Sequence, residues 1–526
     1  MPSLDWIGKA AVVNHHTQVP YRLIRCDNDE SVGGVGEGNL LIEGDNLQAL
    51  KALLPYYGGK VKCCYIDPPY NTGNEKWAYN DNSNAPEIVR WLGATVGSEA
   101  EDLSRHDKWL CMMYPRLLLL RQLLREDGAV FISIDDNEIA HLRLIADEIF
   151  GARNFVANVI WQKMDSPKNT AVHLSEDHDY ILIYAKNSAI WRPNKLPRTE
   201  AMVARYKNPD NDPRGPWLLS DLAARNFYAQ GRYPITTSKG RTIEGPPAGS
   251  YWRVSKERFD ELERDGRIWW GKSGNNRPGI KRFLTEVQIG VVPQTLWMWK
   301  DVGSTRHAKQ ELSRIMEAGA SQDLFITPKP TRLIQRILQI ATDGDSIVLD
   351  SFAGSGTTGH AVLQQNKEDG GTRRFILVEM EESIARHITA ERLRRAIGGY
   401  GDTTGLGGTL RYCTLGEPLF DEHGQLRTGV TFNALAHHIY FTETGEPLTR
   451  RTNGRTPLLG VCNGTAYYLL WDRENGGGVL NNASLRTLPE HNGPKVVYAD
   501  ECRLSPLRLQ QAEIVFKQIP YAIKVN

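Results

Sequence analysis

Residues 346–360, SIVLDSFAGSGTTGH, decide the fold class of this chain of 526 residues. A short apolar run, typical of a buried strand, leads through a glycine-rich turn into a helical pattern. Gly354, Gly356 and Gly359 fit the G-x-G-x-x-G spacing, and Glu379 ends the next apolar run. Such glycines let the backbone approach a cofactor, and an acid at this place can bind ribose hydroxyls. We therefore predict an α/β fold that binds a nucleoside-containing cofactor.

Two blocks of the chain repeat the same alternation of strand and helix patterns. In residues 38–185, apolar β-rich runs such as 61–66 alternate with helical patterns such as 114–127. In residues 331–397, the glycine-rich stretch lies between the helical patterns 331–342 and 357–366. This alternation predicts a parallel or mixed sheet covered by helices, and we expect both blocks to share one sheet.

The composition changes between and after these two blocks. Residues 195–320 are dense in Trp, Tyr, Arg, Gly and Pro and show little periodicity, so they read as an inserted domain. The tail contains short strand-like runs but no motif that indicates a function. We therefore expect a first half at 1–194, an insert at 195–320, a second half at 321–400 and a C-terminal region at 415–526.

The motif Asp67-Pro68-Pro69-Tyr70 follows the apolar run 61–66, where an open α/β sheet places its active site. Two successive prolines fix an extended turn and remove backbone donors, which leaves acceptors beside the Asp67 carboxylate. Such an arrangement suits an exocyclic amine, whose protons could bond to Asp67 and to the Pro68 carbonyl while Tyr70 stacks on the base. Taken alone, the motif fits a turn that ends a strand equally well.

The order of these motifs resembles the β-class DNA amino-methyltransferases, and most closely the modification subunits of Type III restriction-modification systems. DPPYNTG (67–73), FISIDDNE (131–138), TPKPTRLIQRIL (327–338) and DSFAGSGTTGHAV (350–362) stand in the order of that family. The resemblance implies a circularly permuted, Rossmann-like methyltransferase sheet with an inserted target-recognition domain and a C-terminal extension. It also implies that the chain transfers a methyl group from S-adenosylmethionine to adenine N6 at specific DNA sites.

The resemblance assigns roles to individual residues. The catalytic residues would be Asp67, Pro68, Pro69 and Tyr70, which hold the target base. The cofactor-binding residues would be Asp45, Lys329, Pro330, Asp350, Phe352, Gly354, Gly356, Thr357 and Glu379. Phe352 and the two glycines would line the methionine side, and Glu379 would bind the ribose. Asp45 equally fits a helix N-cap, and Pro330 equally fits a structural proline at a helix start.

The insert is the best candidate for gripping DNA. Residues 195–300 contain 19 Lys and Arg against 11 Asp and Glu, although the whole chain has a net charge of only +1. An enzyme that flips a base out of a duplex must hold the flanking DNA. The pool of DNA-contacting residues is Arg225, Arg232, Lys239, Arg241, Arg253, Lys272, Arg277, Lys281 and Arg282. The aromatic residues Tyr233, Trp252, Trp269 and Trp270 lie among them, and for the tryptophans the core of the insert is the better interpretation.

Composition and cysteine usage are typical of a globular protein of the cytoplasm. Hydrophobic residues make up 40% of the chain, and no apolar run is long enough to cross a membrane. The seven cysteines form no CxxC pair, so we expect buried or free thiols. Asp135, Asp136 and Glu138 precede a helical pattern, where helix capping is a better interpretation than a metal site, and we predict no metal.

Three other functions fit parts of the sequence. Cytosine-N4 methylation would use the same exocyclic-amine chemistry, and Asp67 favours adenine only statistically. A nicotinamide-dependent oxidoreductase would explain the glycine turn but not the motif at Asp67. A DNA-recognition subunit without activity would explain neither Asp67 nor Tyr70. The partners that we expect are double-stranded DNA, a second copy of the chain and a restriction or helicase subunit.

Overall fold

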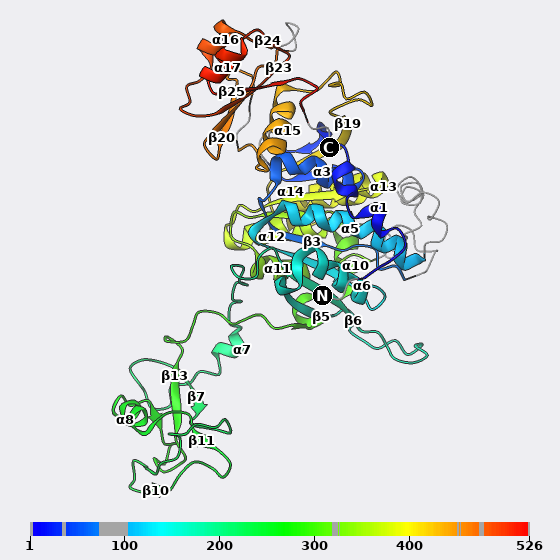
Figure 1. Ribbon diagram of the computed structural model, residues 1–526. Helices are drawn as coiled ribbons and strands as arrows, with labels where there is room; N and C mark the ends of the chain where they lie inside the picture. The colour runs from blue at the N-terminus through cyan, green and yellow to red at the C-terminus, as the bar shows by residue number, and fades with distance from the viewer. Residues whose placement is uncertain are drawn as a thin grey trace. The chain divides into compact units, whose positions relative to one another are not determined.

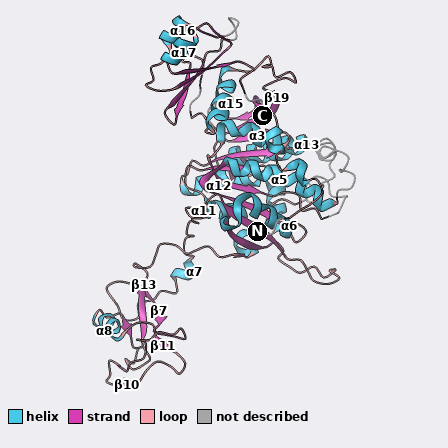
Figure 2. Cartoon of the chain, in the orientation of Figure 1, coloured by secondary structure: helices cyan, strands magenta, loops and turns pink. Residues whose placement is uncertain are grey.

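The computed structural model describes residues 4–33, 38–72, 104–317, 325, 327–449, 452, 454–472 and 478–523. The chain forms two compact units, one of Met1–Asn194 with Gln294–Asn526 and the other of Lys195–Pro293 (Figures 1 and 2). The smaller unit begins where the insert was predicted to begin. The predicted end at residue 320 was wrong, because α9 (Trp299–Val302) packs on α11 and α10 (Thr305–Ile315) on α14, both in the larger unit.

A ten-stranded mixed sheet forms the core of the larger unit, in the order β1-β19-β2-β16-β15-β3-β4-β6-β5-β14. The strands from β19 to β4 run parallel, whereas β1 and β6 pair antiparallel with their neighbours. The strand bounds are β1 Arg22–Val32, β2 Leu40–Glu43, β3 Val61–Ile66, β4 Leu124–Ile134, β5 Phe155–Gln162, β6 His178–Ala185, β14 Leu296–Trp297, β15 Ile347–Asp350, β16 Arg374–Glu379 and β19 Leu410–Pro418.

Helices cover both faces of this sheet. Leu349 and Ile132 pack into one hydrophobic cluster with α3 and α5, whereas Leu377 lies on the other face against α12, so close that a Cβ added to Gly359 would lie 3.0 Å from it. Besides α9 and α10, the helices that the structure describes in the larger unit below residue 400 are α1 Lys9–Val12, α2 His15–Gln18, α3 Asn46–Tyr57, α5 Arg105–Leu123, α6 Ile139–Ala146, α11 Thr331–Ala341, α12 Thr357–Asp369, α13 Glu382–Ile384 and α14 Glu391–Gly398, with short helical turns at Asp147–Gly151, Ala152–Asn154 and Ala385–Ala390. Among the described residues, none of the helices has the length and apolarity to cross a bilayer.

The strand order joins the two halves that are far apart in the sequence. β15, from the second block, pairs with β3 from the first, and Leu349 lies opposite Cys64. Both strands point the same way, so Asp350 and Asp67 leave the sheet at the same edge. This confirms the prediction that the two blocks share one sheet.

The smaller unit has its own core. Its strands are β7 Trp217–Asp221, β8 Ala223–Ala224, β9 Ile235–Thr236, β10 Thr242–Ile243, β11 Tyr251–Trp252, β12 Ile268–Trp269 and β13 Gly279–Phe283, and its helices are α7 Glu200–Val203 and α8 Lys256–Arg264. Tyr233, Trp252 and Trp270 are buried together with Phe259 of α8. Trp269 is half-buried against Trp217, with ring centroids 5.3 Å apart. The expected core role of Trp252 and Trp270 is thus confirmed, and Trp269 lies at the edge of that core.

The C-terminal region forms a second, smaller sheet in the order β20-β21-β23-β25. Helix α15 packs against α3 and belongs to the same hydrophobic cluster. The elements beyond residue 398 are β17 Gly399–Tyr400, β18 Thr403–Thr404, α15 Phe432–Thr444, β20 Leu458–Cys462, β21 Thr465–Leu469, β22 Val479–Leu480, α16 Asn482–Thr487, β23 Lys495–Ala499, β24 Glu501–Cys502, α17 Pro506–Gln511 and β25 Ile514–Gln518.

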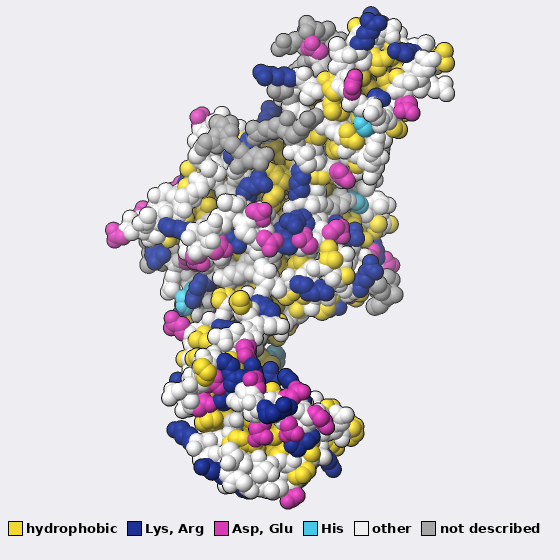
Figure 3. Space-filling view, turned by 90° about the vertical axis from the view of Figure 1, so that its left-hand side faces the viewer, with side chains coloured by type: hydrophobic (Ala, Val, Ile, Leu, Met, Phe, Trp, Pro, Cys, Tyr) yellow, Lys and Arg dark blue, Asp and Glu magenta, His cyan; other side chains and the backbone are white. Residues whose placement is uncertain are grey.

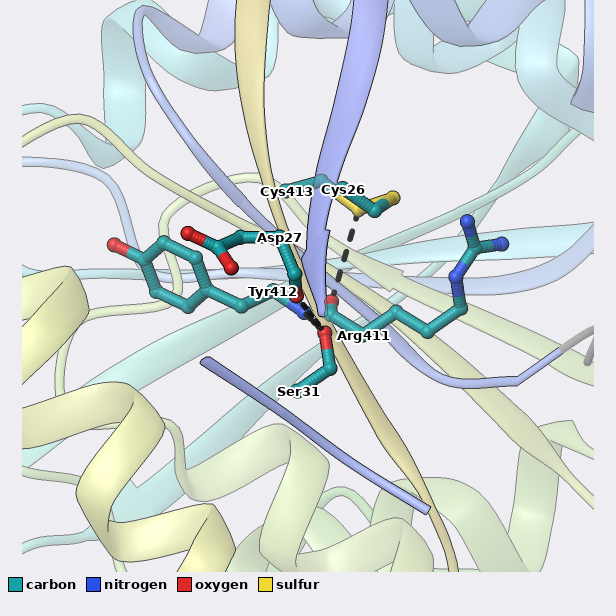
Figure 4. The surroundings of a disulfide bond; sticks show 6 residues. All are labelled: Cys26, Asp27, Ser31, Arg411, Tyr412 and Cys413. Atoms are coloured by element: carbon teal, nitrogen blue, oxygen red, sulfur yellow. Dashed lines mark hydrogen bonds between the residues drawn. A yellow bond between two sulfur atoms is a disulfide. The ribbon is translucent and has the colours of Figure 1, made fainter. Parts of the chain in front are cut away.

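A disulfide bond joins Cys26 of β1 to Cys413 of β19 (Figure 4). The two residues lie directly opposite each other in the antiparallel pair of strands, and Tyr412 N donates to Ser31 Oγ beside them at 3.0 Å. The prediction that all seven cysteines are thiols was therefore wrong for these two. They lie 387 positions apart in the sequence, and only the pairing of β1 with β19 in the fold brings them together. The other five cysteines are free.

Candidate active site

The turn after β3 holds Asp67 in direct contact with a lysine from the other half of the chain. Lys329 Nζ donates to both carboxylate oxygens of Asp67, each at 2.6 Å. The same ammonium lies 5.0 Å from the centroid of the Tyr70 ring. Trp109 of α5 donates its indole N–H to the Pro69 carbonyl at 2.7 Å, which fixes the turn from behind. Thus three of the four predicted catalytic residues, Asp67, Pro69 and Tyr70, interact with residues outside the motif.

Two opposing effects act on the Asp67 carboxyl, whose side chain is only 14% exposed. Burial raises its pKa above the ordinary value, and the Lys329 ammonium lowers it without cancelling the rise. Burial and the neighbouring Asp67 charge also raise the pKa of Tyr70 well above its usual range, so its phenol stays neutral. The ionisation of Asp67 therefore depends on Lys329.

The glycine-rich turn after β15 is organised by Asp350. Its carboxylate accepts hydrogen bonds from the Phe352 backbone N–H at 3.0 Å and from the Thr358 hydroxyl at 2.5 Å. Gly354 and Gly356 have φ values of 49° and 76°, a region that side chains with a Cβ rarely adopt. Burial raises the pKa of Asp350 to about 7. Asp350 thus shapes the turn, and it also lines the adjacent cavity.

Glu379, at the end of β16, points its carboxylate toward the glycine-rich turn. One carboxylate oxygen accepts from Gly354 N at 2.8 Å and the other from Glu381 N at 3.0 Å. Burial raises its pKa to about 8. The predicted ribose contact stays a prediction, and Glu379 in addition holds the backbone of the glycine turn.

A small cavity connects Asp67 with the glycine turn. Its residues are Tyr65, Asp67, Phe325, Thr327, Pro328, Lys329, Asp350, Phe352, Ala353, Gly354, Ser355, Thr357 and Thr358. The cavity measures only about 20 Å³, far below the 300 Å³ or so at which ligand pockets begin. The Phe325 ring is one reason for the small volume, because it lies close to the glycine turn. A Cβ added to Gly354 would lie only 2.9 Å from this ring. Phe325 lies outside the sequence motifs, so no local pattern predicts its place in the cavity.

Lys329, Pro330 and Thr357 connect this cavity to the helices behind it. The Thr357 hydroxyl donates to the Lys329 carbonyl at 3.1 Å and accepts from buried Arg392 at 2.8 Å. Pro330 is the residue before α11, as its structural interpretation predicted. The Lys329 ammonium contacts Asp67, and its predicted contact with the cofactor stays a prediction.

Asp45 lies at the end of β2, two residues after Glu43, which is opposite Glu379 in the parallel pair. Its side chain caps α3 by accepting from Gln48 N at 2.9 Å and lies 3.3 Å from Arg116. The N-cap interpretation is confirmed. The contact with a cofactor adenine stays a prediction.

Glu138 joins the region after Tyr70 to α5 and α6. Its fully buried carboxylate accepts from His106 Nδ1 at 2.6 Å, from His141 Nδ1 at 2.8 Å and from the Asn71 amide. Asn71 also donates to the Arg105 carbonyl and has a φ of 58°. The three ligand-type groups of His106, Glu138 and His141 lie within 4.8 Å of one another, and hydrogen bonds satisfy the carboxylate.

The predicted capping role of the acids before α6 was only partly right. Asp135 accepts from Asn137 N at 2.9 Å and so stabilises the turn, and Asp136 accepts from the Tyr180 hydroxyl. Glu138 makes no capping hydrogen bond to the helix. Its carboxylate instead forms hydrogen bonds with His106, His141 and Asn71.

We expect Glu138→Ala to lower the free energy of unfolding by about 2–4 kcal/mol, because it leaves two imidazoles and the Asn71 amide without their buried acceptor. Urea denaturation of the full chain measures the change. Glu422→Ala is the matched control, since that side chain is 87% exposed and its loss should cost almost nothing. Equal stability of both variants would contradict the role of Glu138.

The basic residues of the smaller unit differ in exposure. Arg225, Arg232, Lys239, Arg241, Arg253, Lys272, Arg277 and Arg282 are exposed, as DNA contacts require. Lys281 is not: its side chain is 6% exposed and its ammonium pairs with Asp210 and, at 2.9 Å, with Asp212. The prediction for Lys281 was therefore wrong, because β13 turns it into the unit. On the face seen in Figure 3, Lys and Arg side chains alternate with Asp and Glu.

Part of the chain matches the model of a known protein family. The family model described as DNA methylase matches residues 61–391, which include both Asp67 and the glycine turn. The PvuII DNA methyltransferase, described as cytosine-N4-specific, superposes with a TM-score of 0.34 at 13% identity, over 67% of this chain and 86% of that one.

Curated relatives extend the match. The Mod subunit of the Type III restriction-modification enzyme StyLTI from Salmonella typhimurium is 36% identical over 74% of this chain and 60% of its own length. The EcoPI Mod subunit of Escherichia phage P1 is 33% identical over 74% of this chain and 65% of its own length. The chain thus spans somewhat less than two thirds of the length of these relatives. The family model covers well over half of the chain and includes both parts of the site, so the chain belongs to the DNA methylase family.

Proposed function

We propose that this chain is a site-specific DNA methyltransferase that transfers a methyl group from S-adenosylmethionine to the N6 of a flipped-out adenine. One observation carries the proposal: Asp67 and the glycine turn at Gly354 line the same cavity at the carboxyl ends of neighbouring parallel strands. The amine-binding turn and the cofactor turn therefore meet, as methyl transfer requires.

The chemistry of the residues around the cavity suits the cofactor. The positive φ values of Gly354 and Gly356 leave a turn without Cβ atoms, and Glu379 lies at the neighbouring strand end. S-adenosylmethionine would supply an electrophilic methyl group on a sulfonium, so the chain needs no metal for the reaction. Phe352 and Gly354 would hold its methionine side and Glu379 its ribose.

Asp67 prepares the amine. The lone pair of an adenine amino group is delocalised into the ring, so the nitrogen is a poor nucleophile. Hydrogen bonds from its two protons to Asp67 and to the Pro68 carbonyl favour a pyramidal nitrogen, and Tyr70 stacks on the base. As the amine accepted the methyl group, Asp67 would take one proton from the nitrogen and pass it to water.

Nucleoside mass spectrometry tests the proposal. The full chain is incubated with bacterial DNA and S-adenosylmethionine, and the DNA is digested to nucleosides. N6-methyladenine is the expected product, and N4-methylcytosine alone would overturn the choice of base. Thermal stabilisation by NAD but not by S-adenosylhomocysteine would overturn the whole assignment in favour of an oxidoreductase.

The relatives named as Mod subunits support a place in a Type III restriction-modification system. We propose that the chain acts in the cytoplasm on double-stranded DNA, as a homodimer that associates with a restriction or helicase subunit. The exposed basic residues of the smaller unit would contact the DNA backbone and base edges.

Adjacent residues of β13 test the DNA-binding part of this proposal. Arg282→Ala should weaken DNA binding and reduce the slope of log affinity against log salt by about 1, because Arg282 is exposed. Lys281→Ala should leave that slope unchanged but lower the melting temperature, because Asp210 and Asp212 lose a buried partner. Fluorescence anisotropy at several salt concentrations measures the slope. An unchanged slope in Arg282→Ala would remove this residue from the DNA contacts.

A further inference from the structure

The loop that joins β5 to β6 presents two apolar side chains to solvent. Val172 is 90% exposed and Leu174 87% exposed, more than any other large hydrophobic residue that the structure describes in the larger unit. Figure 1 shows this loop extending away from the sheet. Single exposed apolar residues are common on proteins, but two that are nearly bare and two positions apart suggest a surface that is covered by a partner.

The loop starts at the same edge of the sheet as the active site. β4 runs parallel to β3, and Ile134 at its carboxyl end lies opposite Tyr180 of β6. Gln162, the last residue of β5, lies opposite His178. The loop between these strands therefore leaves the sheet on the side where Asp67 follows β3.

An ion pair at the base of the loop lies close to the catalytic residues. Lys163 Nζ contacts Asp179 at 2.7 Å, where the loop returns to the sheet. The Asp179 charge contributes to raising the pKa values of both Asp67 and Tyr70, after the larger effect of burial.

The loop is braced below its tip. The backbone N–H groups of Lys163 and Met164 donate to the Asp177 carbonyl at 2.9 and 3.2 Å. Higher up, Lys168 N donates to Ser175 Oγ at 2.7 Å. Asp165 forms an ion pair with Arg306 at the start of α10. These bonds stabilise the base of the loop, so Val172 and Leu174 lie at the tip of an ordered loop.

We propose that Val172 and Leu174 form a wedge that enters the base stack of double-stranded DNA and fills the space left by the extruded target nucleotide. The inference rests on the proposed function, and it assigns the base-extrusion step to this loop. Flipping a base breaks its pair and its stacking, and apolar side chains inserted between base steps compensate for that loss. The loop has the required apolar tip, the support, and a position at the catalytic edge.

A double variant, Val172→Ser with Leu174→Ser, tests the wedge in single-turnover methylation of two duplexes. One duplex has the target adenine paired with thymine; the other has an abasic site opposite it, so that the adenine is already unpaired. We expect the variant to be slower than wild type by about tenfold or more on the paired duplex and to approach wild type on the abasic one. 2-Aminopurine at the target position should also show less fluorescence increase with the variant.

Leu507→Ser is the matched control, because Leu507 is 66% exposed on α17 of the C-terminal region and should leave both rates unchanged. A variant that methylates the paired duplex at the wild-type rate would overturn the wedge, and so would one that is equally slow on both duplexes. Failure of the proposed function gives a different result, since the wild-type chain would then methylate neither duplex.

Discussion

Asp67→Ala is expected to lower the rate of methyl transfer by at least about 10²–10³-fold and to leave the affinity for S-adenosylhomocysteine within a few-fold of wild type. In the proposed mechanism the Asp67 carboxylate is the charged acceptor for the amine, and it lies beside the glycine turn, which Asp350 holds. Loss of the acceptor removes a hydrogen bond that grows stronger as the amine becomes positive in the transition state. Single-turnover kinetics measure the rate, and isothermal titration calorimetry measures the affinity.

Asp67→Asn is the matched variant, because it keeps the size of the side chain but exchanges one acceptor oxygen for an NH2 donor. It should also be strongly impaired, with less effect on stability than alanine, since Lys329 keeps one oxygen partner. If Asp67→Ala methylated DNA at the wild-type rate, the role of Asp67 in preparing the amine would be refuted. A loss of cofactor affinity that matched the loss of rate would place Asp67 in the cofactor site instead.

The sequence was sufficient for the parts of the site that depend on local order. The glycine turn follows its strand directly, and Asp67-Pro68-Pro69-Tyr70 follows another, so alternation and spacing predicted both and their common sheet edge. The aromatic core of the smaller unit was also predictable, because Trp252 and Trp270 are too apolar to be left on a surface.

The contacts that tune the site were not predictable in this way. Lys329 and Asp67 are 262 residues apart, and no spacing rule connects them. Glu138 precedes a helix and so reads as a cap, yet His106 and Asn71 compete for its carboxylate. The pairing of Cys26 with Cys413 depends on β1 and β19 becoming neighbours across 387 residues. Such features follow from tertiary packing, which local patterns do not encode.

Lys329→Met is expected to move the acidic limb of kcat/KM to higher pH by about 1–3 units. In the proposed mechanism Asp67 must be ionised to accept the amine protons. Burial raises the pKa of Asp67, and the Lys329 ammonium lowers it. Without the ammonium, the Asp67 pKa rises further, so at a given acidic or neutral pH less of the enzyme carries the carboxylate. The pH dependence of kcat/KM measures the shift, because this quantity reports the free enzyme, where the 2.6 Å contact exists.

Lys329→Arg keeps the positive charge and should leave the midpoint of the limb close to that of wild type. In Lys329→Met, raising the pH should close the difference in kcat/KM from wild type, because above its raised pKa the Asp67 carboxyl is ionised even without the ammonium. An unchanged midpoint would show that Lys329 leaves Asp67 before the substrate is bound. A deficit that stayed constant across the whole pH range would assign Lys329 to holding the cofactor or the base, and not to the charge of Asp67.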